Sequence, residues 1–242
     1  MKRIFSTVFS LALILSPAFA APSVKADTTK SKASADAGRV RVPVNLAVLI
    51  QDDLVSRVGN ELGRTRDFIE QLPAGSRVMV GYVTSGTLQV RQPFTEDLGQ
   101  AAKSLRAVVG NSAGSPYNPY VEVREALKRF PADNRNANVL LLVSDGLDIS
   151  RGTDFASVVN SVDLNSASRE AQRRGVAVYT FYAPTNLTES SRTAASYGQS
   201  ALNRLSEQTG GESFFQGFGY VSFDPYFNNL ARAINDRFAG VR

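Results

Sequence analysis

The chain has 242 residues and contains neither cysteine nor histidine. It therefore has no disulfide, thiolate metal site or cysteine nucleophile, and it lacks both the commonest general base and the commonest transition-metal ligand. Its formal charge of +5 comes from scattered basic residues, so the sequence does not predict nucleic-acid binding. Any bound metal would have to be a hard cation held by oxygen atoms.

The first 20 residues have the features of a secretory signal peptide. Lys2 and Arg3 are positive, Leu11 to Leu15 lies within an apolar stretch, and Ala18-Phe19-Ala20 is a small-x-small cleavage site. Residues 21–41 carry few large apolar side chains and are expected to form a disordered linker before a single domain over residues 42–242. No later apolar segment is long enough to span a membrane, so we expect a secreted or periplasmic protein without membrane insertion.

Strand and helix patterns alternate from residue 44 onwards. Strands are expected over residues 44–50, 77–84, 87–91, 139–143, 176–182 and 213–215, and helices over 54–72, 96–109, 120–130, 165–174, 199–208 and 223–238. Val139 to Val143 is apolar throughout, as is typical of a strand buried on both faces. The alternation predicts an α/β fold with a doubly wound, mostly parallel central sheet, helices on both faces and one antiparallel edge strand.

Acidic residues follow two of the apolar strands. Asp52 and Asp53 come after the first, and Asp145 comes after the strand over 139–143. In open α/β sheets, ligands bind outside the carboxyl ends of the strands, and if these two strands are neighbours their carboxylates converge at one edge. Two structural alternatives stay open: Asp52 or Asp53 is the N-cap of the next helix, and Asp145-Gly146 is only a turn.

Four stretches in order carry a resemblance to a known family. They are Asn45–Ile50, Leu140–Gly146, Arg174–Tyr179 and Leu205–Gly211, the last reading Leu-x-x-x-Thr-Gly-Gly. Together they resemble the von Willebrand factor type A domain from about residue 42 to the C-terminus. The resemblance implies a doubly wound sheet with one antiparallel edge strand.

The family's metal-ion-dependent adhesion site uses Asp-x-Ser-x-Ser after the first strand, a Thr from a later loop and an Asp after the central strand. Asp145 matches the last ligand, and Ser115 is the nearest match to the loop Thr. In the first motif Gln51 stands at the Asp position, Asp53 at the first Ser and Val55 at the second. The resemblance thus implies a degenerate site with Asp53, Ser115 and Asp145 as the metal ligands, no certain cofactor, and at most weak Mg²⁺ or Ca²⁺ binding.

A second alignment of the first motif is possible. Sliding it by one residue brings Asp52 to the Asp position and Ser56 to the second Ser, while Leu54 takes the first. If no metal is bound, the same edge could bind a partner through its polar loops and through Arg57 or Arg151.

The sequence has no Gly-x-Ser-x-Gly elbow, no catalytic triad and no phosphate-binding glycine loop, so we expect no enzyme. The favoured function is a secreted, bacterial, non-enzymatic protein-binding or adhesion module whose partner is another protein or an envelope or extracellular component. This partner would dock at the carboxyl ends of the strands. Two alternatives are a metal-assisted hydrolase using the same carboxylates and a structural envelope component.

An aromatic-rich stretch runs from Phe214 to Tyr220. Burial preferences predict that Phe214 and Phe215 are core residues and that only Phe218 or Tyr220 is exposed.

Overall fold

The strand predicted over residues 139–143 lies at the centre of the sheet. The computed structural model describes residues 38–84, 86–110, 118–133, 135–150, 152, 161–218 and 222–238. Within these residues six strands form one sheet in the order β3-β2-β1-β4-β5-β6, and every neighbouring pair is parallel except β2 and β3. Leu141 of β4 pairs with Val48 of β1 on one side and Tyr179 of β5 on the other, and it is fully buried.

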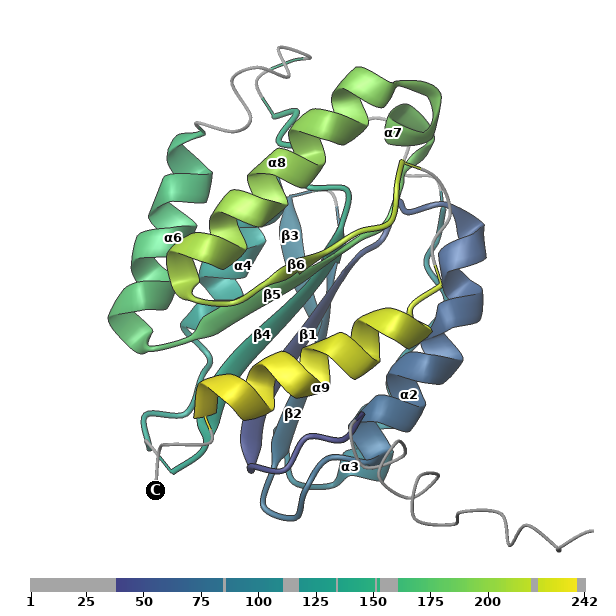
Figure 1. Cartoon of the computed structure of the whole chain (residues 1–242). Helices are drawn as coiled ribbons and strands as arrows, with labels where there is room; N and C mark the ends of the chain where they lie inside the picture. The colour runs from purple at the N-terminus through teal and green to yellow at the C-terminus, as the bar shows by residue number, and fades with distance from the viewer. Residues whose placement is uncertain are drawn as a thin grey trace, which may run out of the picture.

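The strands alternate with helices along the chain (Figure 1). The strands are β1 Val44–Gln51, β2 Arg77–Thr84, β3 Thr87–Thr95, β4 Ala137–Ser144, β5 Ala177–Tyr182 and β6 Ser213–Phe214. The helices are the 3-10 helix η1 Ser56–Glu61, α2 Leu62–Glu70, α3 Leu98–Lys103, α4 Pro119–Leu127, α6 Val162–Arg174, α7 Asn186–Ser190, α8 Arg192–Thr209 and α9 Asp224–Phe238.

Each face of the sheet is covered by its own set of helices. In Figure 1, α2, α3 and α9 cover one face, and α4, α6 and α8 cover the other. Successive residues of a strand face opposite ways, so Leu46 and Val48 of β1 join the first core while Ala47 and Leu49 join the second. The doubly wound α/β fold predicted from the alternating pattern is confirmed.

Two predicted helices are shorter than expected. The helix predicted over 54–72 begins as η1 at Ser56, because the N–H of Val55 donates to the carbonyl of Pro184 and Leu54 forms an isolated bridge with Thr185. The helix predicted over 96–109 is limited to α3, whose N-cap is Asp97. Long-range contacts at these ends replace the helical hydrogen bonds that local periodicity predicts.

The aromatic residues after β5 anchor α9 and β6 to the sheet. Phe181 lies at the centre, with ring centroids 5.7 Å from Phe214, 5.4 Å from Phe223 and 5.0 Å from Phe227. Phe214 is a core residue as predicted, but the prediction for Phe215 is wrong, since it is 42% exposed. β6 ends at Phe214, so the next side chain no longer faces the core.

At the other end of the chain, the predicted signal peptide lies outside the described residues. Residues 38–41, which we assigned to the linker, contact α9: Val40 is buried, the N–H of Arg41 donates to Asn235 Oδ1, and Asn235 Nδ2 donates to the carbonyl of Arg39. The packed domain therefore includes these residues. No helix within the described ranges has the length and apolar character needed to cross a membrane.

Candidate functional site

The acidic residues singled out in the sequence follow two neighbouring parallel strands. Ile50 of β1 is in register with Val143 of β4, so the two strands end side by side. Asp52 and Asp53 follow β1, and Asp145 follows β4. We call this side of the sheet, where the parallel strands end, the C-terminal edge.

Asp145 is a buried carboxylate bound only by neutral donors. Its Oδ1 accepts from the N–H of Leu147 at 3.0 Å, and its Oδ2 accepts from Thr185 Oγ1 at 2.7 Å. Burial, and then the negative charge of Asp53, raise the pKa of Asp145 to about 6. Among the described residues no Lys or Arg forms an ion pair with Asp145. The described residues therefore place no positive side chain against its negative charge.

Gln51 occupies the position at which the family motif has its first Asp, and its amide joins the two strand ends. Its Oε1 accepts from Ser144 Oγ and, at 3.3 Å, from the N–H of Asp145. Its Nε2 donates to Asp53 Oδ1 at 2.8 Å. Burial raises the pKa of Asp53 despite this hydrogen bond. Gln51 thus holds the Asp53 and Asp145 loops together without contributing a charge.

Asp52 is committed to a structural ion pair. Its two carboxylate oxygens accept from Arg106 Nη1 and Nη2, both at 2.7 Å, and Oδ1 also accepts from the N–H of Val109 at 3.1 Å. The Arg106 guanidinium lies over the ring of Tyr82, 4.1 Å from its centroid. The N-cap of η1 is Val55 and has no side-chain cap, so the expectation that Asp52 or Asp53 caps the next helix is wrong. Asp52 instead anchors the segment after α3.

The other positions named from the sequence have four different outcomes. Val55 is only 6% exposed and belongs to the core, so no oxygen stands at that position of the motif. Ser56, the ligand of the shifted alignment, begins η1 and is exposed. Ser115 and Arg151 lie outside the described residues. Arg57 forms an ion pair with Glu189.

Thr185 is a residue of the site that sequence reasoning missed. It follows β5, the parallel neighbour of β4, and it is also the N-cap of α7, where its Oγ1 accepts from the N–H of Thr188. The signal that could have found it is its place after the apolar strand that ends at Tyr182. A hydroxyl donor to Asp145 thus comes from a strand end that was not considered.

The backbone of Asp145 and Gly146 is packed against α8 without space for an added side-chain atom. A Cβ on Gly198 of α8 would lie 2.0 Å from the carbonyl oxygen of Asp145. A Cβ on Gly146, which has a φ of 77°, would lie 2.3 Å from the carbonyl oxygen of Gly198. Tyr120 Oη donates to the carbonyl of Gly146 at 2.6 Å. The Asp145 carboxylate is therefore held on a rigid turn.

Exposed apolar side chains gather around the same edge. Within the described residues the exposed large hydrophobic side chains are Val109, Val162, Phe215 and Phe218, at 67%, 60%, 42% and 43% exposure. The N–H of Val109 donates to Asp52 Oδ1, which places Val109 at this edge, and the two phenylalanines follow β6. Val162 begins α6, which runs back to the start of β5 and so begins at the C-terminal edge. Among the described residues, the edge thus combines the Asp53 and Asp145 carboxylates with exposed apolar groups.

No protein-family model and no curated protein sequence matches the chain. Among solved structures it is similar to the conserved hypothetical protein BatB from Bacteroides thetaiotaomicron, with 11% identity, a TM-score of 0.55, and 83% of this chain and 100% of that chain covered. It is similar to an aerotolerance-related membrane protein from Bacteroides fragilis at 12% identity and a TM-score of 0.53, covering 81% and 100%.

A third similar structure is proximal thread matrix protein 1 from the mussel byssus, solved with a zinc-occupied metal-ion-dependent adhesion site. It has 10% identity and a TM-score of 0.50, covering 82% of this chain and 48% of that chain. The fold is that of the von Willebrand factor type A domain, as the sequence motifs predicted.

Proposed function

We propose that the protein is a secreted or periplasmic, non-enzymatic protein-binding module whose partner docks at the C-terminal edge. The observation that carries this proposal is that the exposed large apolar side chains of the described residues lie at the edge that holds Asp53 and Asp145. Exposed apolar groups beside polar ones mark interaction sites, and aromatic residues are enriched in the centre of protein interfaces. Phe215 and Phe218 are the proposed apolar anchors.

Asp53 and Asp145 are the proposed polar contacts of this surface. Asp53 is partly exposed, and the Asp145 carboxylate behind it has no cation of its own within the described part of the chain. A basic group of the partner placed near Asp53 would relieve the repulsion between the two carboxylates. An uncompensated buried charge in a rigid setting is a recognised feature of functional sites.

The residues present fit the family's metal site poorly. The position of the first Asp is taken by a neutral amide that already accepts from Ser144 and Asp145, and Val55 supplies no oxygen. Among the described side chains, no group of three or more His, Cys, Asp or Glu is placed to hold a metal ion. We therefore propose Asp53, Ser115 and Asp145 as ligands for no more than a weakly held Mg²⁺ or Ca²⁺, and partner binding without a tightly bound metal.

Thermal melting with EDTA, Mg²⁺ or Ca²⁺ tests the metal proposal. A ligand at 100 times its dissociation constant stabilises the folded state by about 2.7 kcal/mol, so a tight site would be obvious, and millimolar Mg²⁺ should change the melting temperature little. The triple variant Gln51→Asp, Asp53→Ser, Val55→Ser should gain a Mg²⁺-dependent rise that Asp145→Ala abolishes. A large Mg²⁺ shift in the unmodified protein would contradict the proposal.

Capture of partners from the envelope fraction of the source organism tests the binding proposal. The unmodified chain should retain a stoichiometric protein partner, and the double variant Phe215→Ser, Phe218→Ser should lose it. Arg91→Ser, at an exposed position of β3, is the matched control and should keep it. Equal capture by the phenylalanine variant would show that the partner binds elsewhere. The absence of any stoichiometric partner would favour a structural envelope component.

A further inference from the structure

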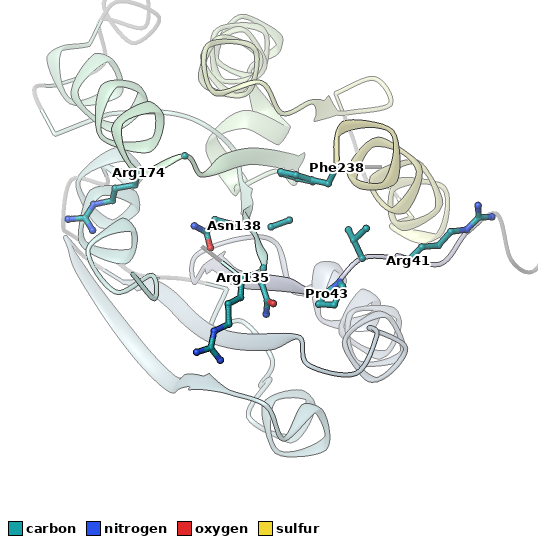
Figure 2. Close-up of a pocket in the computed structure, with 10 residues that line it drawn as sticks. Arg41, Pro43, Arg135, Asn138, Arg174 and Phe238 are labelled. Carbon is teal, nitrogen blue, oxygen red and sulfur yellow. The ribbon is translucent and has the colours of Figure 1, made fainter. Parts of the chain in front are cut away.

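A cavity of about 460 Å³ opens near the N-terminal ends of β1 and β4, whereas the Asp145 site lies at their C-terminal ends. Its lining comes from the chain just before β1 and β4, from the end of α6 and from the last residue of α9 (Figure 2). Ligand pockets have volumes of roughly 300 to 1,000 Å³, so the cavity is large enough for a side chain or a small ligand. We call it the arginine pocket, after Arg41, Arg135 and Arg174 in its lining.

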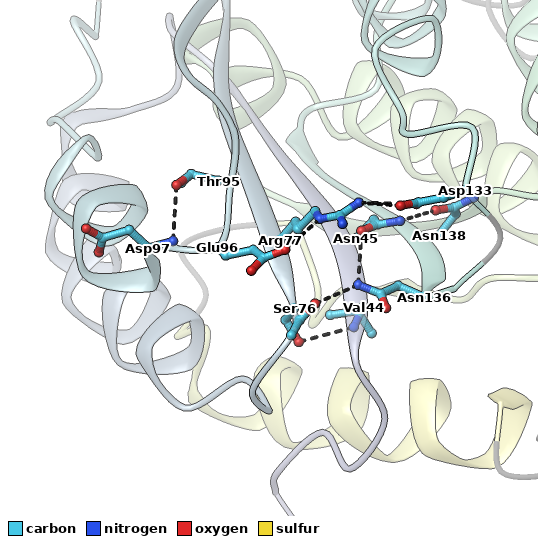
Figure 3. A network of polar contacts seen from close by, with 11 residues as sticks. Val44, Asn45, Ser76, Arg77, Thr95, Glu96, Asp97, Asp133, Asn136 and Asn138 are labelled. Carbon is cyan, nitrogen blue, oxygen red and sulfur yellow. Dashed lines mark hydrogen bonds and ion pairs between the residues drawn. The ribbon is translucent and has the colours of Figure 1, made fainter.

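A network of asparagines joins β1 to β4 (Figure 3), and two of its members, Asn136 and Asn138, line the arginine pocket. Asn45 Nδ2 donates to Asn138 Oδ1 at 2.9 Å, and Asn136 Nδ2 donates to Asn45 Oδ1 at 3.2 Å and to the carbonyl of Gly75 at 2.8 Å. Because the oxygen of the Asn138 amide is taken, its Nδ2 is the group left to donate. Asn138 lines the cavity and is 8% exposed, so this donor is available to a ligand.

The rim of the pocket is positive, and none of the described residues that line it carries a carboxylate. Arg135 forms no ion pair with a described residue, and Arg174 donates its Nε to Glu170, which leaves the two Nη groups of its planar fork. Figure 2 shows the guanidinium groups of Arg135 and Arg174 pointing outward from the cavity, with Pro43 and Phe238 as apolar parts of the wall. Guanidinium groups bind carboxylates in a bidentate manner.

We propose that the arginine pocket binds an acidic peptide segment of a partner protein. An apolar side chain of the segment enters the cavity against Pro43 and Phe238, and Asn138 Nδ2 donates to a backbone carbonyl beside it. Glu or Asp side chains on either side pair with Arg135 and Arg174 at the rim. A small anion inside the cavity would lie away from the outward-pointing guanidinium groups, whereas a peptide extends across the mouth and reaches them.

Fluorescence anisotropy of the full chain with labelled peptides tests this proposal. The probe is a nine-residue peptide with Glu on both sides of a central Leu, and the comparison peptides carry Lys in place of Glu or Gly in place of Leu. The Glu-Leu peptide should bind, with an affinity that falls as salt is raised. The Lys peptide should not bind, and the Gly peptide should bind at least about threefold more weakly because it leaves the cavity unfilled.

Variants of matched charge locate the binding site. The double variant Arg135→Gln, Arg174→Gln should bind the Glu-Leu peptide about tenfold or more weakly, because two charge-assisted contacts are lost. The control Arg91→Gln, Arg192→Gln removes the same charge from exposed positions elsewhere and should change the affinity less than about twofold. Asn138→Asp keeps the acceptor for Asn45 but replaces the donor with a carboxylate, and it should also weaken binding.

Melting temperatures confirm that each variant is folded before its affinity is compared. Equal losses in the two double variants would overturn the proposal, since the contact would then be a general charge effect. Equal binding of the Gly peptide would overturn the role of the cavity. A labelled single-stranded oligonucleotide that binds more tightly than the Glu-Leu peptide would show that the positive rim serves a nucleic acid instead.

Discussion

Asp52 and Asp145 are equally buried, each 3% exposed, and follow neighbouring strands at the same edge of the sheet. They differ in what surrounds the charge. Asp52 has a guanidinium in bidentate contact, whereas Asp145 has one backbone N–H and the hydroxyl of Thr185. A buried carboxylate with its own cation is a structural anchor, and one without a cation keeps the capacity to bind one.

The two carboxylates are also held in place by different means. Asp52 is fixed by an ion pair with Arg106, a residue 54 positions away in the sequence. Asp145 is fixed by close backbone packing of its turn against Gly198 of α8. Each mechanism can be removed separately, so the comparison can be tested by substitution.

The largest effect is expected from Arg106→Met, which leaves Asp52 buried without a cation. Removing one partner of a buried ion pair is strongly destabilising, and we expect a loss of about 3 kcal/mol in the free energy of unfolding. Denaturant unfolding at pH 7 measures it. Asp52→Asn in the same background should recover part of the loss. A loss below about 1 kcal/mol would show that the ion pair is no anchor.

The second effect is on the pH dependence of stability. The pKa of Asp145 is raised in the folded state to about 6, so the folded protein binds this proton more tightly than the unfolded chain does. Its contribution to stability is therefore complete at low pH and is lost as the pH rises through about 6. Between pH 4 and 6 the unmodified protein should lose about 2 kcal/mol more than Asp145→Asn does, measured by urea unfolding. If the free energy of unfolding changes with pH in the same way in both proteins, a cation already compensates Asp145.

A smaller effect is expected from Gly198→Ala. The added Cβ would overlap the carbonyl oxygen of Asp145, and we expect a loss of about 1.5 kcal/mol because overpacking outweighs the better helix propensity of alanine. Gly63→Ala in α2 is the matched control, since nothing lies within 4 Å of its Cβ, and it should be neutral or stabilising. Equal behaviour of both variants in thermal unfolding would contradict the close packing of the turn.

The smallest effect concerns Glu122 of α4, a third buried carboxylate, whose oxygens accept no hydrogen bond from a described residue. Burial, and then the charges of Asp148 and Asp163, raise the pKa of Glu122 to about 7. Stability should therefore continue to fall between pH 6 and 7, where Asp145 completes its ionisation and Glu122 is still titrating. Glu122→Gln should reduce this late fall by about 0.5 kcal/mol. If the free energy of unfolding of Glu122→Gln falls as steeply between pH 6 and 7 as that of the unmodified protein, other groups cause this fall.

Local pattern was enough to predict the sheet and the meeting of Asp53 and Asp145 at one edge. The reason is that runs such as Val139–Val143 identify a buried strand by themselves, and parallel strands must end together. The partner of Asp52 could not be predicted, because the bond to Arg106 depends on where the segment after α3 crosses the edge. Arg106 lies within the helix predicted over residues 96–109, but α3 ends before it, at Lys103.

The role of Gln51 also could not be predicted from the sequence. Alignment with the family motif identified it as a missing charge, but its hydrogen bonds to Ser144, Asp145 and Asp53 depend on the register of β1 against β4. The exposure of Phe215 was missed because β6 ends after two residues, and strand ends are set by the surrounding chain. The hydrogen bonds of Gln51 and the ion pair of Asp52 form only where separate segments meet, so the pattern within one segment does not specify them.

The two outermost strands of the sheet determine how other chains can approach it. β3 carries Pro93, which has no N–H to donate, and the exposed charge of Arg91, and its register against β2 is irregular. β6, on the other side, spans only two residues. Proline, charge, irregular register and short length are the features that prevent strand addition and sheet-to-sheet aggregation. Recruitment by β-augmentation is therefore disfavoured at both outermost strands of the sheet.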